Sequence, residues 1–139
     1  MGAARRGGRW NAPGTPSLYL SENHATAIAE YNQDLDHRGT LVPFDLTSDL
    51  IVDLIDPAVR AACAIDELNL WSPWKRIAYI EKGRPPGWEI SRSLAAAGAD
   101  GVRVPSAQIE GVNIVLWRWN DLSTTNLVAV DPFGDLSGD

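Results

Sequence analysis

The residues best suited to chemistry gather near the start of the chain, in the stretch GGRWNAPGTPSLYLSENHATAIAE at positions 7–30. Within it, Arg9 follows a double glycine and precedes Trp10 and Asn11. Glycine lets a ligand approach the backbone closely, and a guanidinium binds phosphate oxygens in pairs. Arg9 is therefore a candidate contact for a phosphate or a pyrophosphate. Taken alone, Arg9 fits an arginine in a flexible terminal loop better.

Glu30 is the second candidate, because the helix expected around it leaves room beside its carboxylate. The residues three and four positions before it are Ala27 and Thr26, and both are small. Glu30 also adjoins the apolar positions Ala27 and Tyr31, which places it at the buried edge of the helix. Taken alone, Glu30 fits a surface ion pair better, since charged residues are mostly exposed.

Tyr19 and Ser106 complete the set of candidates. Tyr19 points to the opposite side of its strand from Leu18 and Leu20, so it faces a second layer or a cleft if the two leucines lie in the core. Its ring would suit a flat ligand, although ordinary packing is the alternative. Ser106 follows Pro105 at the end of a strand, where a serine can also serve only the backbone of a turn.

Several common catalytic and cofactor motifs are absent from the sequence. There is no GxGxxG, no P-loop lysine pattern and no GxSxG. His24 and His37 have no helical relation, so we expect no zinc pair and no metal site. The single cysteine, Cys63, excludes an intramolecular disulfide, and we interpret it as a buried small hydrophobe on a helix. The remaining chemistry must use an arginine, hydroxyls and a carboxylate.

Length and composition predict one domain over residues 1–139, with a loop at 1–16 and a loose tail at 133–139. The chain is 45% hydrophobic, and its net charge of −6 argues against direct nucleic-acid binding, which needs a basic surface. No apolar run approaches membrane-spanning length, and no apolar segment follows the N-terminal arginines. We therefore expect a cytoplasmic protein that does not bind membranes.

The elements that must position these residues follow from periodicity and capping signals. Alternation and β-rich composition predict strands over 16–21, 39–46, 49–55, 101–108, 112–119 and 127–132. Helices are predicted over 24–33, 57–67, 74–80 and 88–99, the last ended by Gly98. This order indicates a mixed α/β class, more exactly α+β, without a regular βαβ winding.

The six tryptophans need a separate explanation in a chain of this length. Trp71, Trp74 and Trp88 begin or precede helices, and we expect them to pack in the core. Trp117 and Trp119 share one strand face. Core packing is expected for these two as well, with exposure of one of them at an interface as the alternative.

Taken together, the candidate residues resemble the RES domain, the toxin half of RES–Xre toxin–antitoxin systems, which is named for its Arg, Glu and Ser. The opening block GGRWN-x-PGTP-x-LYLSE…A-x-AE resembles the family's first signature, and VPSA at 104–107 followed by Asn113 resembles its last. Arg9 and Tyr19 are ten positions apart and Tyr19 and Glu30 eleven, as the first signature requires. The resemblance extends from Gly2 to about Pro132.

The resemblance implies a compact fold similar to that of ADP-ribosyltransferase toxins. It also implies NAD as substrate, cleavage of the nicotinamide–ribose bond, and inorganic phosphate as co-substrate if the reaction is a phosphorolysis. The implied partner is an Xre-like antitoxin with a helix-turn-helix segment, which covers the active-site entrance. The assembly would be a homodimer or a toxin–antitoxin hetero-oligomer.

The resemblance also assigns roles within the site. Glu30 would stabilise the oxocarbenium ion left on the ribose, and Arg9 would bind the pyrophosphate or the incoming phosphate. Tyr19 would flank the nicotinamide ring, and Ser106 would position the nicotinamide amide or the ribose. The expected catalytic residues are thus Arg9, Tyr19, Glu30 and Ser106, and the expected NAD contacts are Arg9, Trp10, Asn11, Tyr19 and Asn113.

Two alternatives to NAD hydrolysis or phosphorolysis stay open at this point. The same pocket could serve a protein ADP-ribosyltransferase, because both reactions begin by breaking the same bond. The chain could also be a catalytically inactive interaction module. That last alternative would gain weight if Arg9, Tyr19, Glu30 and Ser106 lay on separate faces of the fold.

Overall fold

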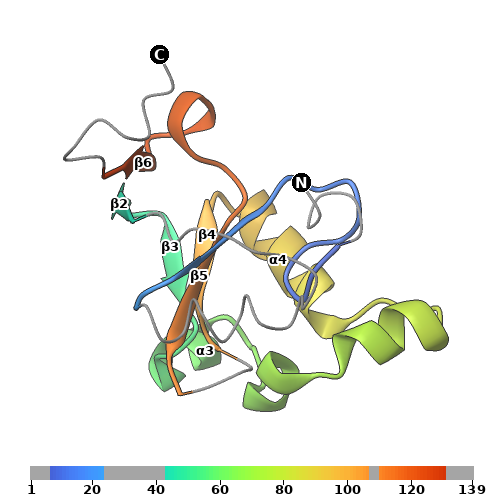
Figure 1. Cartoon of the computed structure of the whole chain (residues 1–139). Coiled ribbons are helices and arrows are strands. Elements are labelled where there is room, and N and C mark those ends of the chain that lie inside the picture. The colour runs from blue at the N-terminus through green and yellow to red at the C-terminus, as the bar shows by residue number, and fades with distance from the viewer. Residues whose placement is uncertain (1–6, 24–42, 107–109, 131–139) are drawn as a thin grey trace.

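The computed structural model describes residues 7–23, 43–106 and 110–130, and short strands and helices follow one another through these ranges (Figure 1). The strands are β1 (Leu18–Ser21), β2 (Phe44–Thr47), β3 (Ile51–Asp53), β4 (Gly101–Pro105), β5 (Val112–Leu116) and β6 (Asn126–Ala129). The helices are α3 (Pro57–Ala62), η1 (Glu67–Trp71), η2 (Arg76–Ile80), α4 (Pro86–Ala96) and η3 (Asn120–Leu122). The predicted mixed α+β class is confirmed.

A four-stranded sheet at the centre of the described residues organises the fold. Its strand order is β1-β5-β4-β3. The β1–β5 and β5–β4 pairs are antiparallel, whereas β3 and β4 are parallel. Parallel neighbours need a crossover connection, and here the crossover contains α3, η1, η2 and α4. The sheet therefore brings the N-terminal strand β1 beside a strand that lies almost one hundred residues later.

The core lies on one face of this sheet. Val102, Val104 and Val115 point into it from β4 and β5 and are almost fully buried. Trp10 from the N-terminal loop and Trp117 just after β5 join the same cluster, and partly buried residues of α4 pack against it. In Figure 1 the N-terminal loop and α4 lie on the same side of the sheet. The loop that carries Arg9 is thus part of the core layer.

The helix predicted over 57–67 is shorter than expected. Asp56 caps its start by accepting a hydrogen bond from the Ala58 N–H at 2.9 Å, with Pro57 in the first turn, as the sequence indicates. The helix ends at Ala62, because Ala64 adopts a left-handed backbone conformation with φ of 56°. Cys63 lies at the C-cap and is exposed, so its interpretation as a buried residue was wrong.

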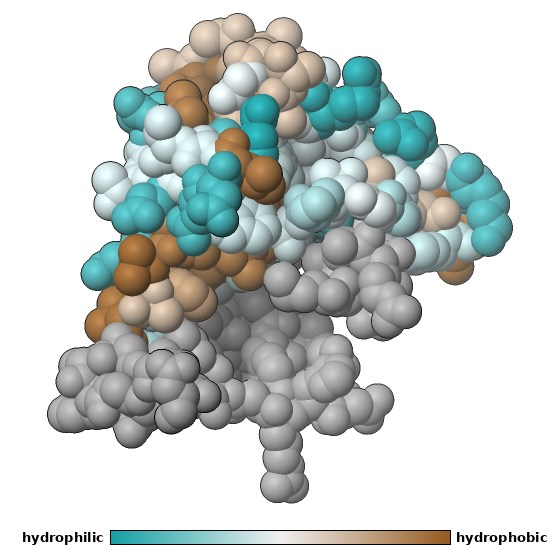
Figure 2. All heavy atoms as spheres, turned by 90° about the horizontal axis from the view of Figure 1, so that it is seen from above, coloured by the Kyte–Doolittle hydropathy of each residue, from teal (hydrophilic) through white to brown (hydrophobic). Residues whose placement is uncertain are grey.

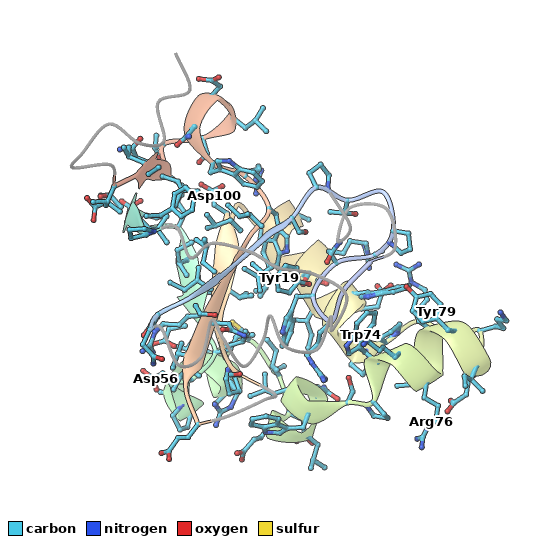
Figure 3. The ribbon with its side chains drawn as sticks, viewed as in Figure 1. Tyr19, Asp56, Trp74, Arg76, Tyr79 and Asp100 are labelled. Atoms are coloured by element: carbon cyan, nitrogen blue, oxygen red, sulfur yellow. The ribbon has the colours of Figure 1, made fainter. Side chains whose placement is uncertain are left out.

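The segment between α3 and α4 also departs from expectation. A 3₁₀ turn, η1, follows Asp66, and the helix predicted over 74–80 is present with a π-helical stretch, η2. Trp71 is 48% exposed and Trp74 is half-buried, so the core packing expected for these two is wrong for Trp71 and partial for Trp74. Figure 3 shows Trp74 and Tyr79 on a helical segment that projects away from the sheet.

Helix α4 begins two residues earlier than predicted, at Pro86 in its first turn, and Gly98 with φ of 105° follows its end as expected. Trp88 is buried as predicted, at 8% exposure. Glu89 forms ion pairs with Arg84 and Arg92, whose hydrogen bonds lower the pKa of Glu89. The side of α4 that bears Glu89 and Arg92 is therefore charged, and the other side of the helix packs against the core.

A second, two-stranded sheet of β2 and β6 is joined to the main sheet through the buried carboxylate of Asp100. Asp100 accepts hydrogen bonds from the hydroxyls of Ser123 and of Thr125, the latter at 2.6 Å, and pairs with Arg118 at 3.3 Å. The Thr125 hydroxyl is in turn 2.6 Å from that of Ser48. Figure 3 shows Asp100 between the main sheet and the β2–β6 region. The Asp100 carboxylate thus joins the start of β4 to the segment between β5 and β6, and Thr125 extends this network to Ser48 after β2.

The remaining predicted strands and the exposed surface agree with an ordinary globular domain. The strands predicted over 39–46, 49–55, 101–108, 112–119 and 127–132 correspond to β2, β3, β4, β5 and β6, of which β3 and β5 are shorter than predicted. The helix predicted over 24–33 lies outside the described residues. Hydrophilic and hydrophobic groups alternate over the described part of the face in Figure 2. In the described ranges, no helix has both the length and the apolarity that a membrane span requires.

Candidate active site

Arg9 lies in a tight turn formed by residues 8–11. Gly8 and Asn11 close the turn through an antiparallel bridge, in which the Gly8 N–H donates to the Asn11 carbonyl at 2.9 Å. Arg9 is half-buried, and its Nη1 donates to the backbone carbonyl of Ser72 at the end of η1. The guanidinium of Arg9 is therefore held against the body of the fold, which excludes the flexible loop considered for it.

Tyr19 holds this turn from the neighbouring strand. Its hydroxyl accepts a hydrogen bond from the Trp10 N–H at 2.9 Å and donates to Asn11 Oδ1 at 2.7 Å. The Asn11 amide continues the chain of hydrogen bonds to the Thr15 carbonyl at 3.3 Å. Figure 3 shows Tyr19 beside the N-terminal loop. The signature residues Arg9, Trp10, Asn11 and Tyr19 thus form one connected unit.

The second glycine of the signature, Gly8, is required for steric reasons. A Cβ on Gly8 would lie 2.5 Å from the Tyr19 hydroxyl oxygen and 2.8 Å from Asn11 Oδ1. Any larger residue at position 8 would therefore displace the side chains of Tyr19 and Asn11 and break the hydrogen bonds that hold the turn. The sequence suggested that glycine here allows a ligand to approach. In the structure, the close approach is made by Tyr19.

Asn113 lies on the same sheet face as Tyr19. Tyr19 is paired with Val115, and Ser21, two residues further along β1, is paired with Asn113. Directly paired residues point to the same face, and successive residues of one face are about 7 Å apart along a strand. The Ser21 hydroxyl donates to Asn113 Oδ1 at 2.8 Å. Ser21 and Asn113 therefore begin a row of polar side chains on this face, next to the buried valines of β4 and β5.

Ser106 extends this polar row onto β4. Val104 is paired with Asn113, and the Ser106 N–H donates to the Gly111 carbonyl at 2.9 Å, which continues the β4–β5 ladder past Pro105. Strand alternation therefore puts Ser106 on the face of Val104 and Asn113. Its side chain is buried at 4% exposure. The sequence motif VPS thus delivers its serine to the face that bears Tyr19.

Tyr19 lies on the sheet face that carries the main core, and not on the face opposite to it. Tyr19 shares its face with the main core cluster, whereas Leu18 and Leu20 are half-buried on the other side of the sheet. The condition that the two leucines lie in the core is therefore not met for the main core cluster. Because β1 is an edge strand of this sheet, Tyr19 reaches the margin of the core and stays 36% exposed. Its ring therefore borders solvent beside the Arg9 turn.

A second arginine of the sheet, Arg103, serves a different face. It bonds Glu22 at 2.6 Å and Asp53 at 3.3 Å on the side opposite Val102 and Val104. The hydrogen bond that Arg103 donates to the Glu22 carboxylate is the main cause that raises the pKa of Arg103 further above its usual range. Arg103 is thus committed to a structural ion cluster on the face away from Tyr19.

Of the six described candidates, Arg9, Trp10, Asn11 and Tyr19 form one connected unit, and Asn113 and Ser106 lie on the sheet face that bears Tyr19. Glu30, the seventh candidate and the predicted carboxylate, lies outside the described residues, as do His24 and His37. Over the ranges that the structure describes, no group of three or more His, Cys, Asp or Glu residues could hold a metal ion. That these side chains contact NAD stays a prediction.

Sequence reasoning missed three groups that contact the Arg9 turn. They are Trp88, whose Nε1 donates to the Gly8 carbonyl at 2.7 Å, Trp117, whose Nε1 donates to the Trp10 carbonyl at 3.2 Å, and Gly87, which touches the Arg9 carbonyl. The only sequence signal for them was an unusual number of tryptophans and a glycine directly after two prolines. Neither signal says which backbone groups an indole N–H will reach.

Tyr19→Phe is expected to destabilise the fold by about 1–2 kcal/mol, because the buried Trp10 N–H loses its acceptor and Asn11 loses a donor. Urea denaturation followed by tryptophan fluorescence measures this change. Tyr79→Phe is the matched control, since Tyr79 is 47% exposed on the projecting helix, and its cost should stay below about 0.5 kcal/mol. Equal effects of the two substitutions would contradict a structural role for the Tyr19 hydroxyl.

Comparison with known proteins gives three findings. The family model for the RES domain matches residues 1–136. Among solved structures, a chain of the M. tuberculosis MbcT–MbcA toxin–antitoxin complex has a similar fold, with a TM-score of 0.67 and 21% sequence identity over 94% of this chain and 72% of that chain. No curated protein matches the sequence. Because the family model spans nearly the whole chain and the signature residues form one unit, this protein belongs to the RES domain family.

Proposed function

We propose that this chain is a toxin enzyme that depletes NAD by breaking the bond between nicotinamide and ribose. The observation that carries the proposal is the placement of Arg9. Its turn is held by Tyr19 over the sheet face that also bears Asn113 and Ser106. A half-buried guanidinium on a turn that an exposed aromatic residue holds, together with a polar row on the same sheet face, suits a dinucleotide with a diphosphate and a flat base.

The reaction would need little acid catalysis. When the C–N bond breaks, its electron pair returns to the pyridinium nitrogen, and nicotinamide leaves as a neutral ring. The ribose carbon is left as an oxocarbenium ion, which a nearby carboxylate stabilises; Glu30 is assigned this role by the RES signature. Water then adds to the carbon and loses a proton to give ADP-ribose, or phosphate adds to give ADP-ribose phosphate.

The described residues would share the work of binding. Arg9 would bind the diphosphate of NAD, or the incoming phosphate. The Tyr19 hydroxyl is already bonded to Trp10 and Asn11, so the exposed side of its ring is the part that would flank nicotinamide. Ser106 and Asn113 would present polar groups to the nicotinamide amide or the ribose hydroxyls.

The proposed regulation is an antitoxin that binds this chain and blocks the site. The similar solved chain comes from a toxin–antitoxin complex. We extend that arrangement to this protein, with an Xre-like antitoxin as the partner. Its helix-turn-helix segment would supply the contact with DNA that the net charge of −6 disfavours for the chain itself.

The test is an assay of the purified protein with NAD labelled in the adenosine moiety. The wild-type chain is expected to release nicotinamide and to form labelled ADP-ribose in phosphate-free buffer, or labelled ADP-ribose phosphate when phosphate is added. Chromatography with mass detection distinguishes these products. A rate that rises in proportion to phosphate would identify phosphorolysis, and a rate independent of phosphate would identify hydrolysis.

The control is a Glu30→Ala protein purified in the same way, which carries the same contaminating host enzymes. NAD loss at equal rates in both preparations would contradict the proposed site. Label transferred to protein, with no free ADP-ribose, would support the ADP-ribosyltransferase alternative instead. No NAD loss by the folded wild-type protein under either buffer condition would favour the catalytically inactive interaction module.

A further inference from the structure

The first turn of α4 contacts the Arg9 turn, although about 80 residues separate the two in sequence. Trp88 lies in this first turn and is 8% exposed. Its indole Nε1 donates to the Gly8 carbonyl at 2.7 Å. The Gly8 carbonyl belongs to the peptide group that joins Gly8 to Arg9, so this hydrogen bond fixes that peptide group. Such a bond is short and largely shielded from water, which favours a defined geometry.

Gly87 brings the helix backbone into direct contact with Arg9. A Cβ at position 87 would overlap the Arg9 carbonyl oxygen and would lie 3.3 Å from the Trp10 ring. Glycine inside a helix costs about 1 kcal/mol relative to alanine, so it needs a packing reason. The close approach to Arg9 is that reason. Only a residue without a side chain lets α4 and the turn touch at this point.

Three successive carbonyls of the turn are therefore fixed by distant parts of the chain. The Gly8 carbonyl bonds to Trp88, the Arg9 carbonyl packs on Gly87, and the Trp10 carbonyl accepts from Trp117 at 3.2 Å. Fixing the backbone on both sides of Arg9 restricts where its guanidinium can lie before a ligand arrives. Pre-ordering of this kind raises affinity, because less conformational freedom is lost on binding.

We propose that Trp88 is a positioning residue for Arg9, and that its indole N–H, with Gly87 beside it, sets the affinity of the site for a nucleoside diphosphate. The proposal rests on the proposed function, since it assigns to Arg9 the diphosphate of NAD. Trp88 acts through the backbone of the turn and touches no substrate. Its contribution should therefore appear in the binding of NAD more than in the chemical step.

The experiment compares Trp88→Phe, which keeps an aromatic ring but removes the N–H, with Trp74→Phe, the same change on the projecting helix. Trp88→Phe is expected to raise KM for NAD by about three- to tenfold, the usual effect of one lost hydrogen bond. Its kcat should stay within about twofold of wild type. Arg84→Ala is a second control, because it removes the cation that lies 5.6 Å over the Trp88 ring and leaves the N–H in place.

A second measurement does not depend on NAD. Hydrogen exchange of the Trp10 N–H, which donates to Tyr19, should become about three- to tenfold faster in Trp88→Phe, while the amides of Val104 and Val115 in the core keep their rates. If Trp88→Phe does not fold, Gly87→Ala tests the same contact, with a larger rise in KM expected. These local changes are ones that a general loss of stability would not produce.

The two proposals can fail separately. Wild-type KM and wild-type Trp10 exchange in a folded Trp88→Phe protein would overturn the positioning role, whatever reaction the site performs. An equal acceleration of the Trp10, Val104 and Val115 amides would also overturn it, since Trp88 would then only stabilise the whole fold. Faster Trp10 exchange in a protein that never cleaves NAD would support the positioning role and reject the proposed function.

Discussion

Arg9→Ala is expected to lower kcat/KM for NAD by about 10²–10³-fold, which is the usual cost of removing one charged or hydrogen-bonding group from a pre-ordered site. The reason lies in the turn that presents the guanidinium. The turn that contains Arg9 is closed by the Gly8–Asn11 hydrogen bond, its Arg9 carbonyl packs against Gly87, and the Arg9 side chain donates to the Ser72 carbonyl. No other arginine can therefore take its place without refolding the loop. Initial rates of nicotinamide release measure the effect.

Arg92→Ala is the matched control for this prediction. Arg92 lies on the exposed side of α4, where it pairs with Glu89 at 2.8 Å, and it lies in no contact with the turn among the described residues. Its removal should leave kcat/KM unchanged within about twofold. Circular dichroism and thermal denaturation must show that Arg9→Ala is folded. Full activity of a folded Arg9→Ala protein would remove Arg9 from the site.

Asp100→Ala is expected to destabilise the fold by about 3 kcal/mol. The Asp100 carboxylate is almost fully buried, and the change leaves the Thr125 and Ser123 hydroxyls without their acceptor and Arg118 without its ion-pair partner. These groups join the β2–β6 sheet and η3 to the main sheet. Urea denaturation gives the free energy of unfolding that tests this value.

Asp121→Ala is the control for Asp100→Ala, because Asp121 is exposed on η3 in the same part of the fold. Its cost should stay within about 0.5 kcal/mol. Asp100→Asn should fall between the two, since an amide oxygen still accepts from the hydroxyls but no longer neutralises Arg118. Similar midpoints for the Asp100→Ala and Asp121→Ala proteins would show that the buried carboxylate does not join the two sheets.

Local signals in the sequence predicted the main elements well, because they act over a few residues. The alternation of Leu18, Tyr19 and Leu20 predicted β1, and Asp56 with Pro57 predicted the start of α3. The end of α3 was missed, because no glycine or proline marks it and Ala64 takes the left-handed conformation instead. The predicted burial of Cys63 and Trp71 was wrong for a different reason, because burial depends on packing that helix propensity does not encode.

In the candidate site too, local signals predicted some of the contacts and could not predict others. The signature spacing predicted that Arg9 and Tyr19 belong together, and the structure joins them through Trp10 and Asn11. The pairing of Ser21 with Asn113 could not be predicted, because the register of β1 on β5 is set by contacts between segments 92 residues apart. The same holds for the indole of Trp88, whose N–H had no partner visible in its own neighbourhood of the sequence.

The order in which the Arg9 turn acquires its supports determines when the candidate site is completed during synthesis. The turn is synthesised before Ser72, Trp88 and Trp117, and β5 must pair with β1 before Tyr19 is fixed. Contacts of such long sequence separation form late in folding. A chain cut short before β5 would therefore lack the supports of the Arg9 turn, so the candidate site is completed only after β5 has been made.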